Sequence, residues 1–145
     1  MIEDLRKRLE SLSGIHKLHA DDVSLLENKL DLVLPNDFKR VSVVCDGAWI
    51  GLYDVKTDSP AFSILTETLR LREAIKLPTN FVVLAEPAGS LIILDCNTGK
   101  VIWLDDIDAL NLTDIPNLHN PDVWNDYITF FSDWLKDAEE EAKLI

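Results

Sequence analysis

Three short apolar runs, with a glycine-containing turn between the last two, constrain the fold of this chain most. The runs are FVVLAE (81–86), SLIILDC (90–96) and KVIWLD (100–105), joined by EPAG and NTG. Their length and β-branched content are typical of strands, and a turn with Gly99 in the left-handed conformation makes 90–105 a hairpin. Because the runs are almost continuously apolar, we expect this antiparallel meander to lie under helices on at least one face.

Helical periodicity marks most of the remaining chain. Apolar residues recur every three or four positions from Ile2 to Leu12, and Gly14 stands where that helix would end. A second helix is expected to start near Asp21 or Asp22. The same spacing predicts two further helices, over 66–77 with Thr66 as its cap and over 120–142 with Asn120 as its cap.

The segment LPNDFKRVSVVCDG (34–47) is compatible with either a helix or a strand. Its VSVV run is β-branched and favours a strand by propensity. Pro35, in contrast, suits a first helical turn, and Gly47 suits a left-handed C-cap. We therefore expect a helix that begins at Pro35, with Asp46 as its last helical or capping residue.

Two short strands are expected after this helix. AWIGLYDV (48–55) follows the glycine, and AFSIL (61–65) follows the turn TDSP. Gly51 would be a bulge or a point of close backbone approach in the first strand. Trp49 and Tyr53 would share one face, because side chains alternate along a strand.

Negative charge is concentrated at the end of the chain. The net charge is −12, and residues 105–145 hold eleven acids and two bases, a net of −9, against −3 for residues 1–104. Such a surface repels phosphate groups, so nucleic acid and anionic membranes are unfavourable partners. It attracts a basic protein, although acidity also promotes solubility on its own.

Length and N-terminal sequence predict a single cytoplasmic domain, 1–145, with an α+β fold. The opening MIEDLRKRLESL lacks the apolar stretch of a secretion signal, and no apolar run approaches the roughly 18 residues of a membrane span. Cys45 and Cys96 both stand in apolar contexts. We expect them to be buried or half-buried free thiols rather than a disulfide.

The predicted C-terminal helix carries an acidic stripe opposite its apolar face. At 100° per residue, five acids fall within about 60° of one another: Asp122, Asp126, Asp133, Asp137 and Glu140. Phe130 lies beside this stripe and Trp49 follows a glycine, so we expect both to be exposed anchors, with the carboxylates setting orientation and association rate. The candidate partner-binding residues are Asp46, Trp49, Asp122, Asp126, Phe130, Asp133 and Asp137.

No residue pattern indicates a catalytic or metal site. Cys45 as a nucleophile would need His16, His19 or His119 brought near by folding, without any local signature. His16 and His19 stand three apart, which suits a metal on one helix face, but a third ligand is not evident. DDIDALNLTD (105–114) lacks the glycine and final glutamate of a calcium loop. Paired carboxylates for hydrolysis occur in any acidic protein, and nothing singles out a pair. We expect no enzyme activity and no cofactor.

Three motifs, in their order along the chain, resemble the SUKH superfamily, which includes the Smi/Knr cell-wall regulators and many bacterial immunity proteins. SLLENKLDLVLPNDFKRVSVVCDGAWIG (24–51) is similar to the opening motif of the family, FVVLAEPAGSLIILDCNTGKVIWLD (81–105) to its central hairpin and WNDYITFFSDWLKD (124–137) to its closing helix. Where family members often carry several glycines before the central strand, this chain has Gly89 alone. The matching residues are Glu27, Leu30, Leu34, Pro35, Asp37, Phe38, Asp46, Gly47, Leu94, Asp95 and Gly99.

The resemblance implies a mostly antiparallel sheet with helices packed mainly on one side. It also implies a non-enzymatic binding protein, namely an immunity protein that neutralises a cognate bacterial toxin, often a nuclease. A nuclease must be basic to hold its substrate, so an acidic protein could occupy its cleft by mimicking phosphate charge. The first alternative is a regulatory scaffold that binds a cellular protein or peptide, and the second is a small enzyme of unknown type.

Overall fold

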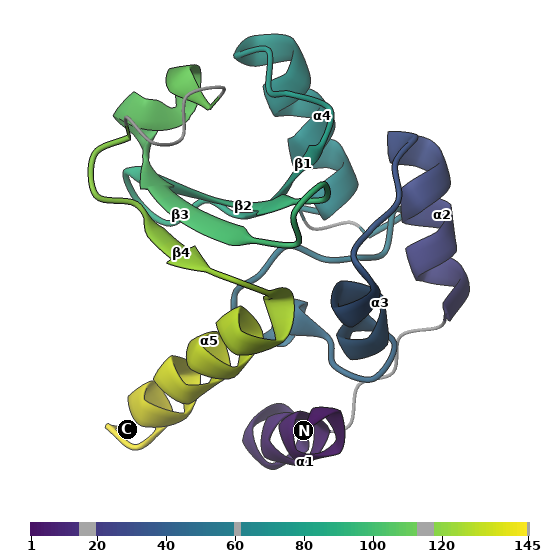
Figure 1. Cartoon of the computed structure of the whole chain (residues 1–145). Helices are drawn as coiled ribbons and strands as arrows, with labels where there is room; N and C mark the ends of the chain where they lie inside the picture. The colour runs from purple at the N-terminus through teal and green to yellow at the C-terminus, as the bar shows by residue number, and fades with distance from the viewer. Residues whose placement is uncertain (15–19, 60–61, 113–117, 145) are drawn as a thin grey trace.

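The computed structural model describes residues 1–14, 20–59, 62–112 and 118–144, and Figure 1 shows the arrangement of its elements. The helices are α1 (Ile2–Ser13), α2 (Ala20–Leu30), α3 (Asn36–Ser42), the 3-10 turn η1 (Gly47–Ile50), α4 (Ile64–Ala74), the 3-10 turn η2 (Asp106–Asn111) and α5 (Tyr127–Ala142). The strands are β1 (Phe81–Ala85), β2 (Ser90–Asp95), β3 (Val101–Asp105) and β4 (Asp122–Trp124).

The strands form one antiparallel sheet in the order β1-β2-β3-β4. Val82 of β1 lies opposite Leu94 of β2, and Ile92 of β2 lies opposite Trp103 of β3. Gly99, in the turn between β2 and β3, has a φ of 80°. The predicted meander, the left-handed Gly99 and the α+β fold are therefore confirmed.

Asp95 organises the turn between β2 and β3. Its Oδ1 accepts hydrogen bonds from Asn80 Nδ2 and from the Asn97 N–H, both at 2.9 Å, and its Oδ2 accepts one from Thr98 Oγ1 at 3.0 Å. Asp95 is buried, and a buried carboxylate is tolerated only when it is hydrogen-bonded. Its place in the hairpin motif is therefore structural.

Helices contribute to cores on both faces of the sheet. Val82 and Leu84 belong to a large cluster with residues of α1, α2, α3 and α5, whereas Phe81 and Val83 belong to a smaller one with Leu71 of α4. In Figure 1, α3 and α5 lie below the sheet, while η2 and α4 lie on its upper side. The expected packing of helices mainly on one side is therefore not confirmed.

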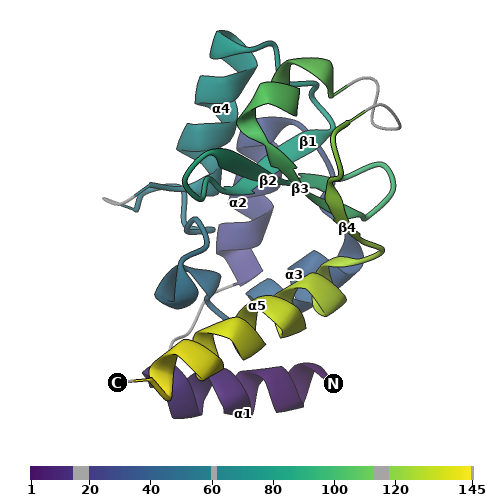
Figure 2. The same cartoon turned by 90° about the vertical axis from the view of Figure 1, so that its left-hand side faces the viewer.

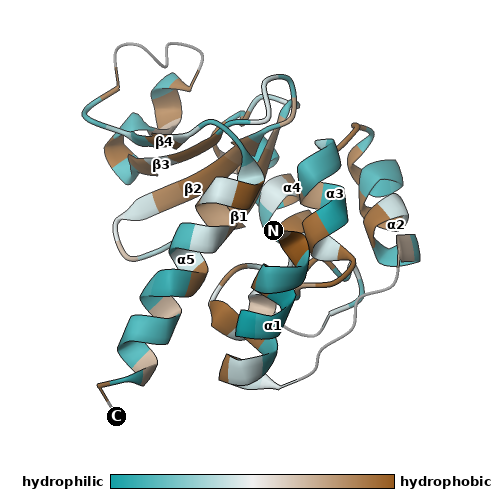
Figure 3. Ribbon diagram, turned by 60° about the horizontal axis from the view of Figure 1, so that its bottom comes forward, coloured by the Kyte–Doolittle hydropathy of each residue, from teal (hydrophilic) through white to brown (hydrophobic). Residues whose placement is uncertain are grey.

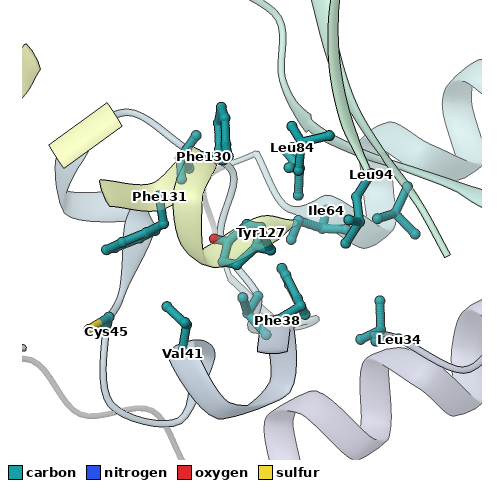
Figure 4. Close-up of a cluster of buried hydrophobic side chains, with 14 of the residues drawn as sticks. Leu34, Phe38, Val41, Cys45, Ile64, Leu84, Leu94, Tyr127, Phe130 and Phe131 are labelled. Carbon is teal, nitrogen blue, oxygen red and sulfur yellow. The ribbon is translucent and has the colours of Figure 1, made fainter. Parts of the chain in front are cut away.

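The large core is built around the aromatic face of α5. Tyr127, Phe130 and Phe131 are each at most 4% exposed. Tyr127 meets Phe38 of α3 edge to face, with ring centroids 4.7 Å apart. Figure 4 shows Tyr127 in the middle of this cluster, which also contains Leu84 of β1. Full burial of one such side chain contributes about 1.5–3 kcal/mol to the stability of the fold. Because α5 buries three of them in one cluster with the sheet and α1 to α3, it holds these elements together.

The segment that follows α3 differs from the prediction. The helix ends at Ser42, before the expected end at Asp46, and Gly47 is not its C-cap. Asp46 instead caps η1 by accepting a hydrogen bond from the Ala48 N–H at 3.0 Å. Gly47 packs closely on Leu52, because a Cβ at this position would lie 2.8 Å from Leu52 Cδ1 and the leucine side chain would have to shift.

Residues 48–55 form no continuous strand. η1 ends at Gly51, whose φ of 93° and ψ of 3° are left-handed values that glycine adopts without strain. Only Asp54 makes a strand-like pairing, an isolated parallel bridge with Ser63. The predicted strand over 48–55 is therefore wrong, and so is the described part of the one over 61–65.

Two helices, α2 and α4, begin earlier in the sequence than expected, before the residues that were predicted to cap them. Ser63 caps α4 in a capping box, in which its Oγ accepts from the Thr66 N–H at 3.1 Å and Thr66 Oγ1 accepts from the Ser63 N–H at 3.2 Å. Thr66 is thus the third residue of the helix and not its cap. Asp21 and Asp22 likewise lie in the first turn of α2.

The sequence before α5 forms a strand and not a first helical turn. Asp122 of β4 lies opposite Trp103 of β3. Residues 122–124, which were predicted to be helical, are therefore part of the sheet. Asn120 has a φ of 48°, which is incompatible with the extended backbone of an N-cap. Asp126 is the cap instead, and it accepts a hydrogen bond from the Thr129 N–H at 2.8 Å.

A carboxylate from α3 holds the first turn of α5. Asp37 Oδ2 accepts hydrogen bonds from the N–H groups of Tyr127 at 2.8 Å and Ile128 at 3.1 Å, while its Oδ1 accepts from the Phe38 N–H at 2.8 Å. First-turn N–H groups have no partner inside a helix, and negative charge is favourable at that end. Asp37 therefore joins segments that lie 90 positions apart in sequence.

Glu27 of α2 fixes the loop that precedes Asp37. Its Oε2 accepts a hydrogen bond from the Leu34 N–H at 2.8 Å and lies 3.1 Å from Lys39 Nζ. Leu34 is buried in the large core. These contacts determine where α3 begins and therefore where Asp37 points, so the opening motif has a structural role.

Replacement of Asp37 by alanine is expected to lower the free energy of unfolding by about 1–3 kcal/mol, because it leaves first-turn amides of α5 without their acceptor. Urea denaturation followed by far-ultraviolet circular dichroism measures this change. Asp58→Ala, which removes an exposed loop carboxylate, is the control and is expected to change stability by less than about 0.5 kcal/mol. Equal effects of the two substitutions would contradict the capping role.

Candidate functional site

The outward side of α5 carries the carboxylates of the predicted acidic stripe. Asp133, Asp137 and Glu140 are exposed. Figure 3 shows much of α5 as hydrophilic, whereas the strands are mainly hydrophobic. Asp122 and Asp126 are also exposed, but they belong to β4 and to the α5 N-cap. The helical part of the stripe is therefore shorter than predicted.

Two of these carboxylates serve the fold as well. The hydrogen bonds that Asp126 accepts from Thr129 hold the pKa of its carboxyl below the usual range. Asp133 Oδ2 accepts a hydrogen bond from Trp124 Nε1 at 2.9 Å. Both groups remain exposed, yet their orientation is set by these contacts.

The remaining carboxylates of α5 differ in whether another described residue neutralises them. Glu139 pairs with Arg8 of α1 at 2.6 Å, where Figure 2 shows the two helices side by side. Three other carboxylates of this helix form no ion pair with a described residue: Asp137, Glu140 and Glu141. The negative charge of this helix is therefore available to a cationic partner.

Two of the predicted binding residues are not on the surface. Phe130 is 1% exposed, so its prediction as an exposed anchor is wrong. It does lie at the edge of the stripe, but the rings of Trp124 from β4 and Trp134 cover it, with centroids 5.1 and 5.8 Å away. Asp46 is 6% exposed and its carboxylate caps η1.

Trp49 is exposed, as predicted, with 59% of its surface accessible. It lies on η1, next to Ile50. Trp134 of α5 donates its Nε1–H to the Ile50 carbonyl oxygen at 2.6 Å, which ties η1 to the helix. The exposed indole of Trp49 therefore projects from a turn that is anchored to the acidic helix.

A groove lies between η1, β3 and α5. It has a volume of about 160 Å³ and combines apolar surface with two carboxylates. Its lining residues are Ile50, Trp103, Trp134, Asp137, Ala138 and Glu141. This groove and the exposed carboxylates around it form the candidate binding surface.

Of the six groove residues, only Asp137 was among the predicted binding residues, and the other five were not. A signal was present on α5, because positions 134, 137, 138 and 141 follow the i, i+3, i+4, i+7 spacing of one helix face. Trp103 had no such signal, since only folding brings β3 beside α5.

The two cysteines are free thiols, one buried and one partly buried, as predicted. Burial raises the pKa of the Cys45 thiol to about 11 and that of the Cys96 thiol to about 12. Both side chains are therefore protonated near neutral pH, and the thiolate that nucleophilic catalysis requires is not favoured.

His119 forms a pair with the buried Asp108 on η2. Its Nδ1 lies 2.8 Å from Asp108 Oδ1, and its backbone N–H donates to Asp108 Oδ2 at 2.9 Å. These bonds raise the pKa of His119 and lower that of Asp108. The double contact fixes the chain after η2. His16 and His19 lie outside the described residues.

The described ranges contain no group of three or more histidine, cysteine or acidic side chains placed to hold a metal ion. Within the same ranges, none of the helices combines the length and apolarity that crossing a bilayer requires.

No protein-family model matches this sequence, and no curated protein matches it significantly. The similarity to the SUKH superfamily therefore rests on the motif residues.

The His119–Asp108 pair is expected to make stability depend on pH. The raised His119 pKa contributes stability below its ordinary value of 6.5, and this is lost as pH rises through the folded-state pKa. The lowered Asp108 pKa contributes above its ordinary value of 3.8 and is lost on acidification. The urea midpoint of His119→Gln is therefore expected to differ from that of the wild type more at about pH 5.5 than at about pH 8.5. Asp108→Asn is expected to show the same trend, and a pH-independent difference would contradict the pair.

Proposed function

We propose that this chain is a non-enzymatic, cytoplasmic protein-binding domain of the SUKH type, an immunity protein that neutralises a basic toxin. The observation that carries the proposal is the exposed acidic side of α5, which lies beside the apolar groove and Trp49. A negative surface with aromatic anchors suits a positively charged protein, because charge speeds association while buried aromatic contacts supply most of the affinity.

The class of partner follows from charge. The chain carries a net charge of −12, and the carboxylates of Asp137, Glu140 and Glu141 have no ion pair with a described residue. Toxins that cleave nucleic acid must be basic where they hold phosphate. A carboxylate surface can occupy such a cleft and exclude the substrate.

The state of the possible nucleophiles supports a binding role. Burial raises the pKa values of both thiols well above neutrality, and Asp108 uses both of its oxygens to hold His119. Two free cysteines without a disulfide are typical of a reducing compartment, which supports the cytoplasmic assignment.

A complex with the product of a neighbouring toxin-like gene is expected to form and to weaken as salt rises. Co-purification followed by titration calorimetry from about 50 to about 500 mM NaCl measures this, because salt screens exposed charges over a few ångströms at the upper end. An affinity that does not change with salt, or the absence of a complex, would contradict the electrostatic mechanism.

Substitution of Trp49 by alanine is expected to weaken the complex about tenfold or more, since exposed aromatic anchors dominate interfaces. Leu110→Ala on η2 is the matched control, because Leu110 is also exposed but lies away from α5. Dissociation constants of the two variants are compared under one salt condition. A larger loss for Leu110→Ala would place the interface on another face.

A further inference from the structure

We propose that the groove between η1, β3 and α5 seats a single arginine side chain of the basic partner. This inference rests on the proposed function, because it names the chemical group that the acidic surface receives. Three features of the groove support it: the aromatic surface, the arrangement of the carboxylates and the size.

The groove offers aromatic carbon surface and no free indole donor. Trp103 donates its Nε1–H to Ser90 Oγ at 2.9 Å, and Trp134 donates its own to the Ile50 carbonyl oxygen at 2.6 Å. The two rings lie 5.7 Å apart with an interplanar angle of 53°. Since both N–H groups are used inside the protein, the rings present carbon surface, including their π faces, to a ligand. Such surfaces attract cations and planar groups.

Two carboxylates line the same groove. Asp137 and Glu141 are four residues apart on α5, both are exposed, and neither has an ion pair with a described residue. Like charges at this helical spacing repel each other, so the unbound protein carries an unfavourable pair. A cation placed between them removes this repulsion and gains two attractions.

The volume decides between a side chain and a small-molecule ligand. About 160 Å³ is well below the roughly 300–1,000 Å³ of pockets that hold cofactors or drug-sized ligands. Arginine matches the lining better than lysine, because its planar guanidinium stacks on aromatic rings and offers a fork of donors to carboxylates. Lysine would supply only a point charge.

The direct test is a titration of the isotopically labelled protein with Nα-acetyl-arginine amide, observed through the indole N–H signals of Trp103 and Trp134. The matched control is Nα-acetyl-citrulline amide, which has almost the same shape without the charge. We expect saturable shifts of both signals with the arginine probe, and binding at least about fivefold weaker with citrulline. Equal responses to the two probes, or no response to arginine, would overturn the proposal.

A pair of charge-matched variants tests the carboxylates. The double variant D137N/E141Q removes the two negative charges that line the groove, and D58N/E73Q removes two exposed charges that lie outside both the groove and α5. We expect the first to lose binding of the arginine probe about tenfold, with no loss of thermal stability because it removes a like-charge pair, and the second to bind normally. Equal weakening by both variants would show general charge attraction and overturn the proposal.

The same variants separate this inference from the proposed function. If D137N/E141Q binds a basic toxin as tightly as the wild type, the arginine site is wrong while the toxin-binding function stands. If the arginine probe binds in the groove and no basic toxin is captured, the site stands and the proposed function is wrong.

Discussion

The carboxylate of Asp37 anchors the first turn of α5 to α3, and much of the molecule depends on the placement of that helix. The hydrogen bonds to Tyr127 and Ile128 connect the third helix of the chain to the last one, while Glu27 fixes the loop from which Asp37 projects. A carboxylate at the positive end of a helix combines hydrogen bonding with dipole stabilisation. This single contact therefore orients both the aromatic face that fills the core and the acidic side that faces outward.

α5 has two roles because its sides differ in chemistry. Tyr127 and Phe131 are buried against the sheet and α3, whereas Asp137 and Glu141 face solvent. Trp134 lies at the boundary, where its N–H binds the Ile50 carbonyl oxygen and its ring lines the groove. A binding surface carried by a packed helix is held more precisely than one carried by a loop, so the proposed site is preorganised for its partner.

Some elements could be predicted because local chemistry is enough to specify them. Gly14 ends α1, and Gly99 with its positive φ closes the hairpin. Other elements could not be predicted, because their backbone groups bind partners from distant parts of the chain. Residues 48–55 form a 3-10 turn followed by irregular chain, in which the Ile50 carbonyl oxygen accepts from Trp134 of α5 and the Tyr53 N–H donates to the Leu84 carbonyl oxygen of β1. Asp122 lies in β4 opposite Trp103 of β3, a pairing that the helical spacing of the local sequence did not indicate.

The sequence by itself determined the antiparallel meander, the α+β class and the acidic C-terminal segment, because hydrophobic runs, turn glycines and charge are properties of neighbouring residues. Only the tertiary structure decided which aromatic residues are exposed. Phe130 lies at the edge of the stripe yet is buried, because Trp124 leaves the helix for β4 and covers it. The groove also exists only after folding, since Ile50 and Trp103 reach α5 from distant segments, and no local pattern encodes a contact between surfaces so far apart in the chain.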